Sequence, residues 1–136
     1  MVNNIIKRQL QIDSRIEELK TCLKVCHEMR DSLSLDCDTY FSFQTSLLEA
    51  VQNAIIHGNK SDASKKVKIE LEVDESSIQV LIEDEGSGFD PDCVANPTCG
   101  DNLTKENGRG IFFIRNLCDG FEVIGKGNIV KLIIRI

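Results

Sequence analysis

The stretch Lys66-Val-Lys-Ile-Glu-Leu-Glu-Val73 alternates charged and apolar side chains from end to end. Because successive side chains of a β-strand point to opposite faces, this period of two predicts a strand with one face in the core and one in water. After a turn over residues 74–77, Ile78, Val80 and Ile82 continue the same alternation. The two runs therefore predict an antiparallel hairpin that places Asp84 at the end of a sheet.

Two helices are expected before this hairpin, preceded by a half-exposed strand over residues 6–12. Ser14-Arg-Ile-Glu17 has the form of a capping box, in which a hydroxyl and a carboxylate bind the free amides of a helix start. The second helix begins after Asp36 or Asp38, with Gly58 as its C-cap. The residues of the first helix expected in the core are Ile16, Leu19, Leu23 and Cys26.

The part of the chain after the hairpin predicts a loop, a short helix and a second hairpin. Residues 86–107 show no sustained period, and an unstructured connection of about 20 residues is uncommon unless it closes over a ligand, so we interpret it as a mobile lid. Residues 111–118 suit a short helix that ends at Gly120. Residues 121–136 then form strands around the turn Gly125-Lys-Gly-Asn128.

Length and composition indicate one soluble domain over residues 1–136. The formal charge of −6 argues against a nucleic-acid surface, which needs clustered Lys and Arg. No apolar run approaches the roughly 20 residues that span a bilayer, so we expect a cytoplasmic protein without membrane contact. In that compartment the six cysteines stay thiols, and Cys22 and Cys26 beside His27 are expected to be core residues rather than metal ligands.

The second predicted helix carries Glu49 and Asn53 one turn apart on a shared polar edge. Magnesium prefers oxygen ligands and retains waters, so it needs few protein groups beside nucleotide phosphates. The amide oxygen of Asn53 fits that task. Glu49 can hold a metal-bound water, or it can accept the proton of an attacking hydroxyl as a general base.

Asp84 follows an apolar strand, where a carboxylate loses hydration and needs a donor to offset the cost. An exocyclic amine such as that of adenine is one such donor. Gly86 and Gly88 lack a Cβ, so the turn Asp84-Glu-Gly-Ser-Gly88 can take positive φ and let a base lie against the backbone.

A second glycine turn, Gly108-Arg-Gly110, precedes the short predicted helix. A helix N-terminus presents unpaired amides and the positive end of a dipole to phosphate oxygens. Arg109 and Lys105 can add charge-assisted contacts. The three motifs occur in the order and spacing of a nucleotide site, and together they predict that the chain binds ATP.

These motifs resemble the N box and the two glycine boxes of the GHKL ATPases, the superfamily of DNA gyrase, the heat-shock chaperone, histidine kinases and mismatch-repair proteins. Within it, the short length and the string Glu49-Ala-Val-Gln-Asn-Ala-Ile-Ile-His-Gly58 are most similar to bacterial anti-sigma-factor serine kinases. The resemblance implies an α/β (α+β) two-layer sandwich, with helices on one face of a mixed, mostly antiparallel sheet (a Bergerat-type ATP-binding fold).

The resemblance also implies roles for single residues. Glu49 corresponds to the base, Asn53 to the Mg²⁺ ligand and Asp84 to the residue that recognises adenine. The nucleotide-contacting turns correspond to Gly86, Gly88, Gly108 and Gly110, whereas Lys105 and Arg109 lie in the lid region without a fixed role. Where the superfamily has threonine near the last hairpin, this chain has Asn128.

Members of the family bind a sigma factor and phosphorylate a serine or threonine of an antagonist (anti-anti-sigma) protein, and they suggest a homodimer. Two other functions stay open. The chain can be an ATP-binding partner-switch module without phosphoryl transfer. It can also be a detached histidine-kinase catalytic domain, an idea prompted by His27-Glu-Met-Arg30, although the phosphoacceptor histidine of those kinases belongs to a separate domain.

Overall fold

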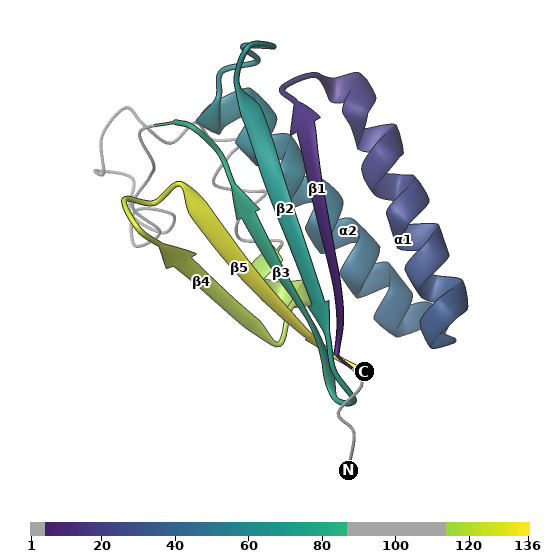
Figure 1. Ribbon diagram of the computed structural model, residues 1–136. Helices are drawn as coiled ribbons and strands as arrows, with labels where there is room; N and C mark the ends of the chain where they lie inside the picture. The colour runs from purple at the N-terminus through teal and green to yellow at the C-terminus, as the bar shows by residue number, and fades with distance from the viewer. Residues whose placement is uncertain (1–4, 87–113) are drawn as a thin grey trace.

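A computed structural model describes residues 5–86 and 114–136 of the chain. Its five strands form a sheet of order β1-β2-β3-β5-β4, in which every hydrogen-bonded pair is antiparallel (Figure 1). The strands are β1 (Ile6–Asp13), β2 (Lys66–Val73), β3 (Ser77–Glu83), β4 (Gly120–Ile124) and β5 (Ile129–Arg135). The hairpin β2-β3 lies in the middle of this sheet, and its two strands are antiparallel, as the sequence predicts.

Two long helices cover one face of the sheet, and no helix of the described residues covers the other face (Figure 1). The helical elements are η1 (Ile16–Glu18), α1 (Leu19–Leu33), α2 (Cys37–Asn53) and η2 (Ala54–Gly58), and residues 114–117 add one further helical turn. The arrangement confirms the predicted α+β class with helices on one side of the sheet. No helix in the described ranges is long and apolar enough to cross a bilayer.

The core lies between the sheet and the helices. Val67, Ile69, Leu71 and Val73 of β2 point into it and are at most 2% exposed, while the charged residues between them face water. From the helix layer, Phe43 and Leu47 of α2 are fully buried against this apolar face. Burying side chains of this size stabilises the fold by about 1.5 to 3 kcal/mol each relative to leaving them exposed.

The predicted capping box at Ser14 is wrong. Arg15 occupies the N-cap of η1 and no side chain caps that helix, while the Ser14 hydroxyl donates to the carbonyl oxygen of Lys65 at 2.8 Å. The core residues predicted for the first helix are also partly wrong. Ile16 is 45% exposed, and of the four predicted residues only Cys26 is fully buried. The buried residues of α1 are Cys22, Val25, Cys26 and Met29.

Helix α2 begins as predicted and ends differently. The Asp36 side chain caps it by accepting a hydrogen bond from the Thr39 amide at 2.7 Å. At the other end the helix widens into the π-turn η2, in which the Asn59 amide donates to the carbonyl oxygen of Ala54. Gly58 lies inside that turn without positive φ, so it is not the left-handed cap that we expected.

The C-terminal hairpin β4-β5 matches its prediction. Its turn places Gly125 at φ 68° and Gly127 at φ 97°, a conformation that residues with a Cβ rarely adopt. Gly120 opens β4 rather than ending the preceding helix, and it packs against the side chain of Ile133. The predicted lid lies outside the described residues, except for Gly86 at its start.

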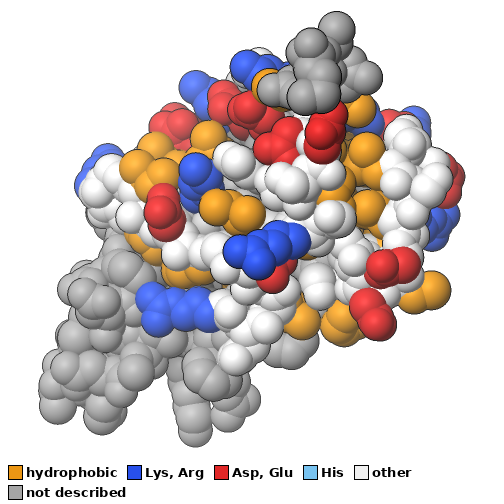
Figure 2. Space-filling view, turned by 90° about the horizontal axis from the view of Figure 1, so that it is seen from below, with side chains coloured by type: hydrophobic (Ala, Val, Ile, Leu, Met, Phe, Trp, Pro, Cys, Tyr) orange, Lys and Arg blue, Asp and Glu red, His pale blue; other side chains and the backbone are white. Residues whose placement is uncertain are grey.

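The start of β1 and the C-terminal end of the chain lie at the same end of the sheet (Figure 1). Three apolar side chains close to them, Ile5, Ile6 and Ile136, are more than 40% exposed. Figure 2 shows this end with acidic and basic side chains interspersed among apolar ones, so neither sign of charge dominates the described part of this face.

Candidate functional site

The last turn of α2 presents two of the predicted site residues. Glu49 and Asn53 are four residues apart on this helix, so their side chains leave the same face one above the other. Both are partly buried. The Asn53 side-chain nitrogen is buried and has no hydrogen-bond partner among the described residues. A buried donor without a partner is costly, and a ligand that supplies oxygen atoms would satisfy it.

Beyond Asn53 the π-turn brings Gly58 against the end of β3. A Cβ on Gly58 would overlap the Asp84 carboxylate, with Oδ1 only 2.8 Å away. A Cβ on Gly86 would overlap the carbonyl oxygen of Gly58 and lie 2.9 Å from Asp84 Oδ1. The missing side chains of both glycines therefore let the end of α2 and the end of β3 meet at van der Waals contact.

This contact corrects the expected reason for a glycine at position 86. The sequence analysis gave Gly86 the role of allowing positive φ in this turn, but the glycines of the described residues with positive φ are Gly125 and Gly127. Gly86 is instead needed because the Gly58 carbonyl fills the space of its Cβ. Gly88 lies outside the described residues, so its conformation stays a prediction.

Three consecutive amides fix the turn at the end of β3. The Asp84 amide donates to the carbonyl oxygen of Asn128, the Glu85 amide to Asn59 Oδ1 at 2.7 Å, and the Gly86 amide to Asp84 Oδ1 at 2.7 Å. Asn128 also donates from its side chain to the Asp84 carbonyl oxygen at 3.0 Å. Among the described residues Asp84 Oδ2 accepts no hydrogen bond, and it lies beside Gly58, where a Cβ would overlap it.

The environment of Asp84 disfavours its charge. Burial raises the pKa of the Asp84 carboxyl above its usual value, and Glu83 nearby adds to this effect. The hydrogen bond from the Gly86 amide and the charges of Lys126 and Lys65 act in the opposite direction but are outweighed. A half-buried carboxylate needs hydrogen-bond donors to offset its lost hydration, and a ligand can supply one.

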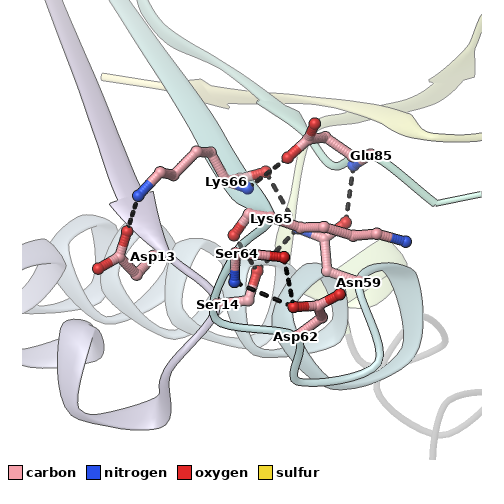
Figure 3. Close-up of polar contacts among 8 residues, drawn as sticks. All are labelled: Asp13, Ser14, Asn59, Asp62, Ser64, Lys65, Lys66 and Glu85. Atoms are coloured by element: carbon pink, nitrogen blue, oxygen red, sulfur yellow. Dashed lines mark hydrogen bonds and ion pairs between the residues drawn. The ribbon is translucent and has the colours of Figure 1, made fainter.

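Asn59 joins the surrounding elements, as Figure 3 shows. Its side-chain nitrogen donates to Ser14 Oγ at 2.8 Å and to the Lys66 carbonyl oxygen at 3.0 Å, and its side-chain oxygen accepts from Glu85. Asn59 is fully buried. One side chain therefore connects the end of β1, the start of β2 and the end of β3 to the π-turn of α2.

The described residues do not form a protein-only metal site. No group of three or more His, Cys, Asp or Glu side chains within them is arranged to hold an ion. Cys22 and Cys26 are buried free thiols, and burial raises their pKa values to about 11 and about 12. Thiols at such pKa values stay protonated at neutral pH, and a metal binds the thiolate. This favours the core role that we expected for both.

Comparison with known proteins identifies the family of this chain. Residues 12–134 match the family model described as the histidine kinase-like ATPase domain. The chain belongs to this family. The predicted resemblance to the GHKL superfamily is thereby confirmed.

Among individual relatives of this histidine kinase-like ATPase domain are three bacterial proteins named anti-sigma F factor. The Oceanobacillus iheyensis protein is 36% identical over 89 residues, the Shouchella clausii protein 34% over 85 and a Clostridium perfringens protein 33% over 92. These alignments cover 64%, 61% and 62% of this chain and 61%, 58% and 62% of the relatives. The chain thus spans about three fifths of the length of the curated relatives it matches.

A solved structure supports the fold alone. The crystal structure of the RsbU and RsbW domains of a Mycobacterium tuberculosis protein superimposes with a TM-score of 0.66 at 12% identity. The match covers 96% of this chain and 32% of that chain. Nearly the whole domain therefore has the arrangement of a known histidine kinase-like fold.

The structure brings part of the predicted site of this ATPase domain together. Asp84 and Gly86 lie against the turn that follows Asn53, and Glu49 lies one turn before it on the same helix. The remaining predicted residues lie outside the described part of the chain and stay predictions: Gly88, Lys105, Gly108, Arg109 and Gly110.

The sequence analysis did not identify the roles of two residues of this site, Asn59 and Gly58. Asn59 carries no periodic signal. Its place directly after the helix-ending Gly58 is the one hint that its side-chain amide is buried. Gly58 was noticed only as a cap. Asn128 stands where the superfamily has threonine, and the structure gives it a different task, since its amide binds the Asp84 backbone.

Proposed function

We propose that this histidine kinase-like ATPase domain binds ATP with Mg²⁺ between the end of α2 and the end of β3. The observation that carries the proposal is the half-buried Asp84 carboxylate, whose Oδ2 accepts no hydrogen bond from the described residues, beside the glycine contact at Gly58 and Gly86. The described residues fit the nucleotide in two ways. Asp84 offers a buried acceptor for the exocyclic amine of adenine, and Asn53 has an unsatisfied buried amide close to the same turn.

The proposed roles follow the predicted motifs. Asn53 holds Mg²⁺ through its amide oxygen, and its nitrogen is left to donate to a phosphate oxygen or a water. Gly88, Gly108 and Gly110 are assigned to the turns that contact the nucleotide. Lys105 and Arg109 add positive charge beside them.

We propose further that the domain is a serine/threonine protein kinase. ATP supplies the phosphoryl group, and Mg²⁺ neutralises the charge of its phosphates. Glu49 accepts the proton of the substrate hydroxyl as general base, since it lies one helical turn from Asn53. A base in this position contributes typically 10² to 10⁴ in rate.

The partners are proposed from the relatives, which are named anti-sigma F factors. We propose that the chain sequesters a sigma factor in the cytoplasm and phosphorylates a serine or threonine of an antagonist protein that competes for it. A homodimer is part of this proposal. Direct contact with nucleic acid or with a membrane is not.

Phosphoryl transfer tests the kinase proposal. The chain is incubated with γ-labelled ATP, Mg²⁺ and a candidate antagonist found by pull-down from the native host with and without ATP. We expect acid-stable label on serine or threonine of the antagonist. Glu49→Gln should slow transfer at least about 100-fold while ATP affinity changes little. Asp38→Asn makes the same carboxylate-to-amide change in the first turn of α2 and should leave the rate unchanged.

Each other outcome points to a different function. Nucleotide-dependent complex formation without any labelled protein favours a partner-switch module that does not transfer phosphate. Acid-labile label on histidine favours a detached histidine-kinase domain. Full transfer by the Glu49→Gln variant removes the assignment of the base.

A further inference from the structure

We infer that Asn59 is a positioning residue for base recognition: it orients the Asp84 carboxylate by holding the adjacent Glu85 amide. The inference rests on the proposed function, because it assigns Asp84 the task of accepting a hydrogen bond from adenine. It adds a residue that lies outside the three motifs and that contacts no ligand itself.

The first step concerns the bonds that determine where the Asp84 carboxylate points. Asp84 Oδ1 accepts from the Gly86 amide, so the direction of the carboxylate depends on how the backbone runs from residue 84 to residue 86. On the β5 side, Asn128 holds both the amide and the carbonyl of Asp84. On the helix side, the Glu85 amide is held by Asn59 Oδ1 at 2.7 Å.

The second step concerns the rigidity of Asn59. Its side chain is fully buried, and its nitrogen uses both protons, one to Ser14 Oγ and one to the Lys66 carbonyl. Its own backbone amide closes the π-turn on Ala54. A side chain fixed at three points by different elements presents its oxygen to Glu85 in one orientation.

The third step excludes a substitute for Asn59 among the described residues. Glu85 has a second link to the same region, because its carboxylate accepts from the Lys66 amide. This link runs through the exposed side chain of Glu85 and does not hold its backbone amide directly. Gly58 and Gly86 touch without a hydrogen bond between them in the described set. Without Asn59, the turn would lose its directional bond to the helix layer.

The test compares the affinity of the full chain for ATP and for inosine triphosphate, which carries a carbonyl in place of the exocyclic amine. The wild type should bind ATP about 10-fold or more tightly, since a site built to bind a donor rejects an analogue that lacks it. In Asn59→Ala this ratio should fall to about 3-fold or less, chiefly through weaker ATP binding. Affinities are measured below the unfolding temperature of each variant and corrected for the folded fraction.

Asp36→Ala is the matched control. It removes a side-chain oxygen that accepts from a backbone amide, as Asn59 does, but at the start of α2 and without contact to Asn59, so it should lower the unfolding temperature and keep the ATP preference of the wild type. If the role of Asn59 is merely structural, the ratio of ATP affinity to inosine triphosphate affinity stays at the wild-type value in both variants. That result would overturn the inference. If Asn59→Ala does not fold, Asn59→Ser, which is too short to reach Glu85, is measured instead with the same two outcomes.

The wild-type titration keeps the two proposals apart. A wild type that binds neither nucleotide, or both equally, contradicts the proposed role of Asp84. A wild type that prefers ATP, together with an Asn59 variant that keeps the full preference, contradicts only the inference on Asn59.

Discussion

Replacing Gly86 by alanine tests the contact between the end of α2 and the end of β3. A Cβ at this position would overlap the Gly58 carbonyl oxygen and lie 2.8 Å from the Gly58 carbonyl carbon. Both are backbone atoms, so the two segments must separate. Overpacking of this kind costs about 1 to 3 kcal/mol. Separation also strains the Asn59 bond to Glu85, worth about 1 kcal/mol more.

We therefore expect Gly86→Ala to lower the free energy of unfolding by about 2 to 4 kcal/mol, measured by urea denaturation at pH 7. The matched control is Gly120→Ala, whose Cβ would meet the side chain of Ile133 at 3.1 Å. A contact at this distance is relieved by a shift of a few tenths of an ångström, so we expect a loss below about 1 kcal/mol. Equal small losses in both variants would refute the packing argument.

Two further predictions concern the same region. Asp84→Asn should not lower the free energy of unfolding at pH 7, because burial raises the folded-state pKa of Asp84 above its unfolded value and the charged form therefore opposes folding. Any gain in stability should vanish below about pH 4, where the carboxyl is protonated in both states. Urea denaturation at both pH values checks this, and a clear loss of stability at pH 7 contradicts it. Ser14→Asp should lower the free energy of unfolding by about 3 kcal/mol, because it buries a carboxylate against the Lys65 carbonyl. A helix N-cap would tolerate aspartate. A thermal melt unchanged from the wild type would therefore support the capping box instead.

Much of the fold follows from local sequence patterns. The alternation along β2 encodes which face is buried, and the glycines of the β4-β5 turn encode positive φ, so both elements could be predicted from neighbouring residues alone. The cap at Asp36 is local in the same sense, because its partner Thr39 is three residues away. The predicted site residues on α2 and at Asp84 also depend on short motifs.

The parts that the sequence analysis missed depend on contacts between distant segments. Ser14 looks like a cap because Glu17 follows it, yet its hydroxyl binds Lys65 and Asn59. The role of Gly58 depends on Asp84, which lies 26 residues away in the sequence. No periodicity within a single element encodes such a pair, so the π-turn and the Asn59 connections could be found only in three dimensions.

Isothermal titration calorimetry tests the central claim most directly. The chain is titrated with ATP in the presence of Mg²⁺, and the heat of binding is recorded. The account predicts saturable binding of one nucleotide per chain, and a large loss of affinity in Asp84→Ala while that variant stays folded. Absence of binding heat at millimolar ATP, or equal affinity of the wild type and the variant, would contradict a nucleotide site at the end of β3.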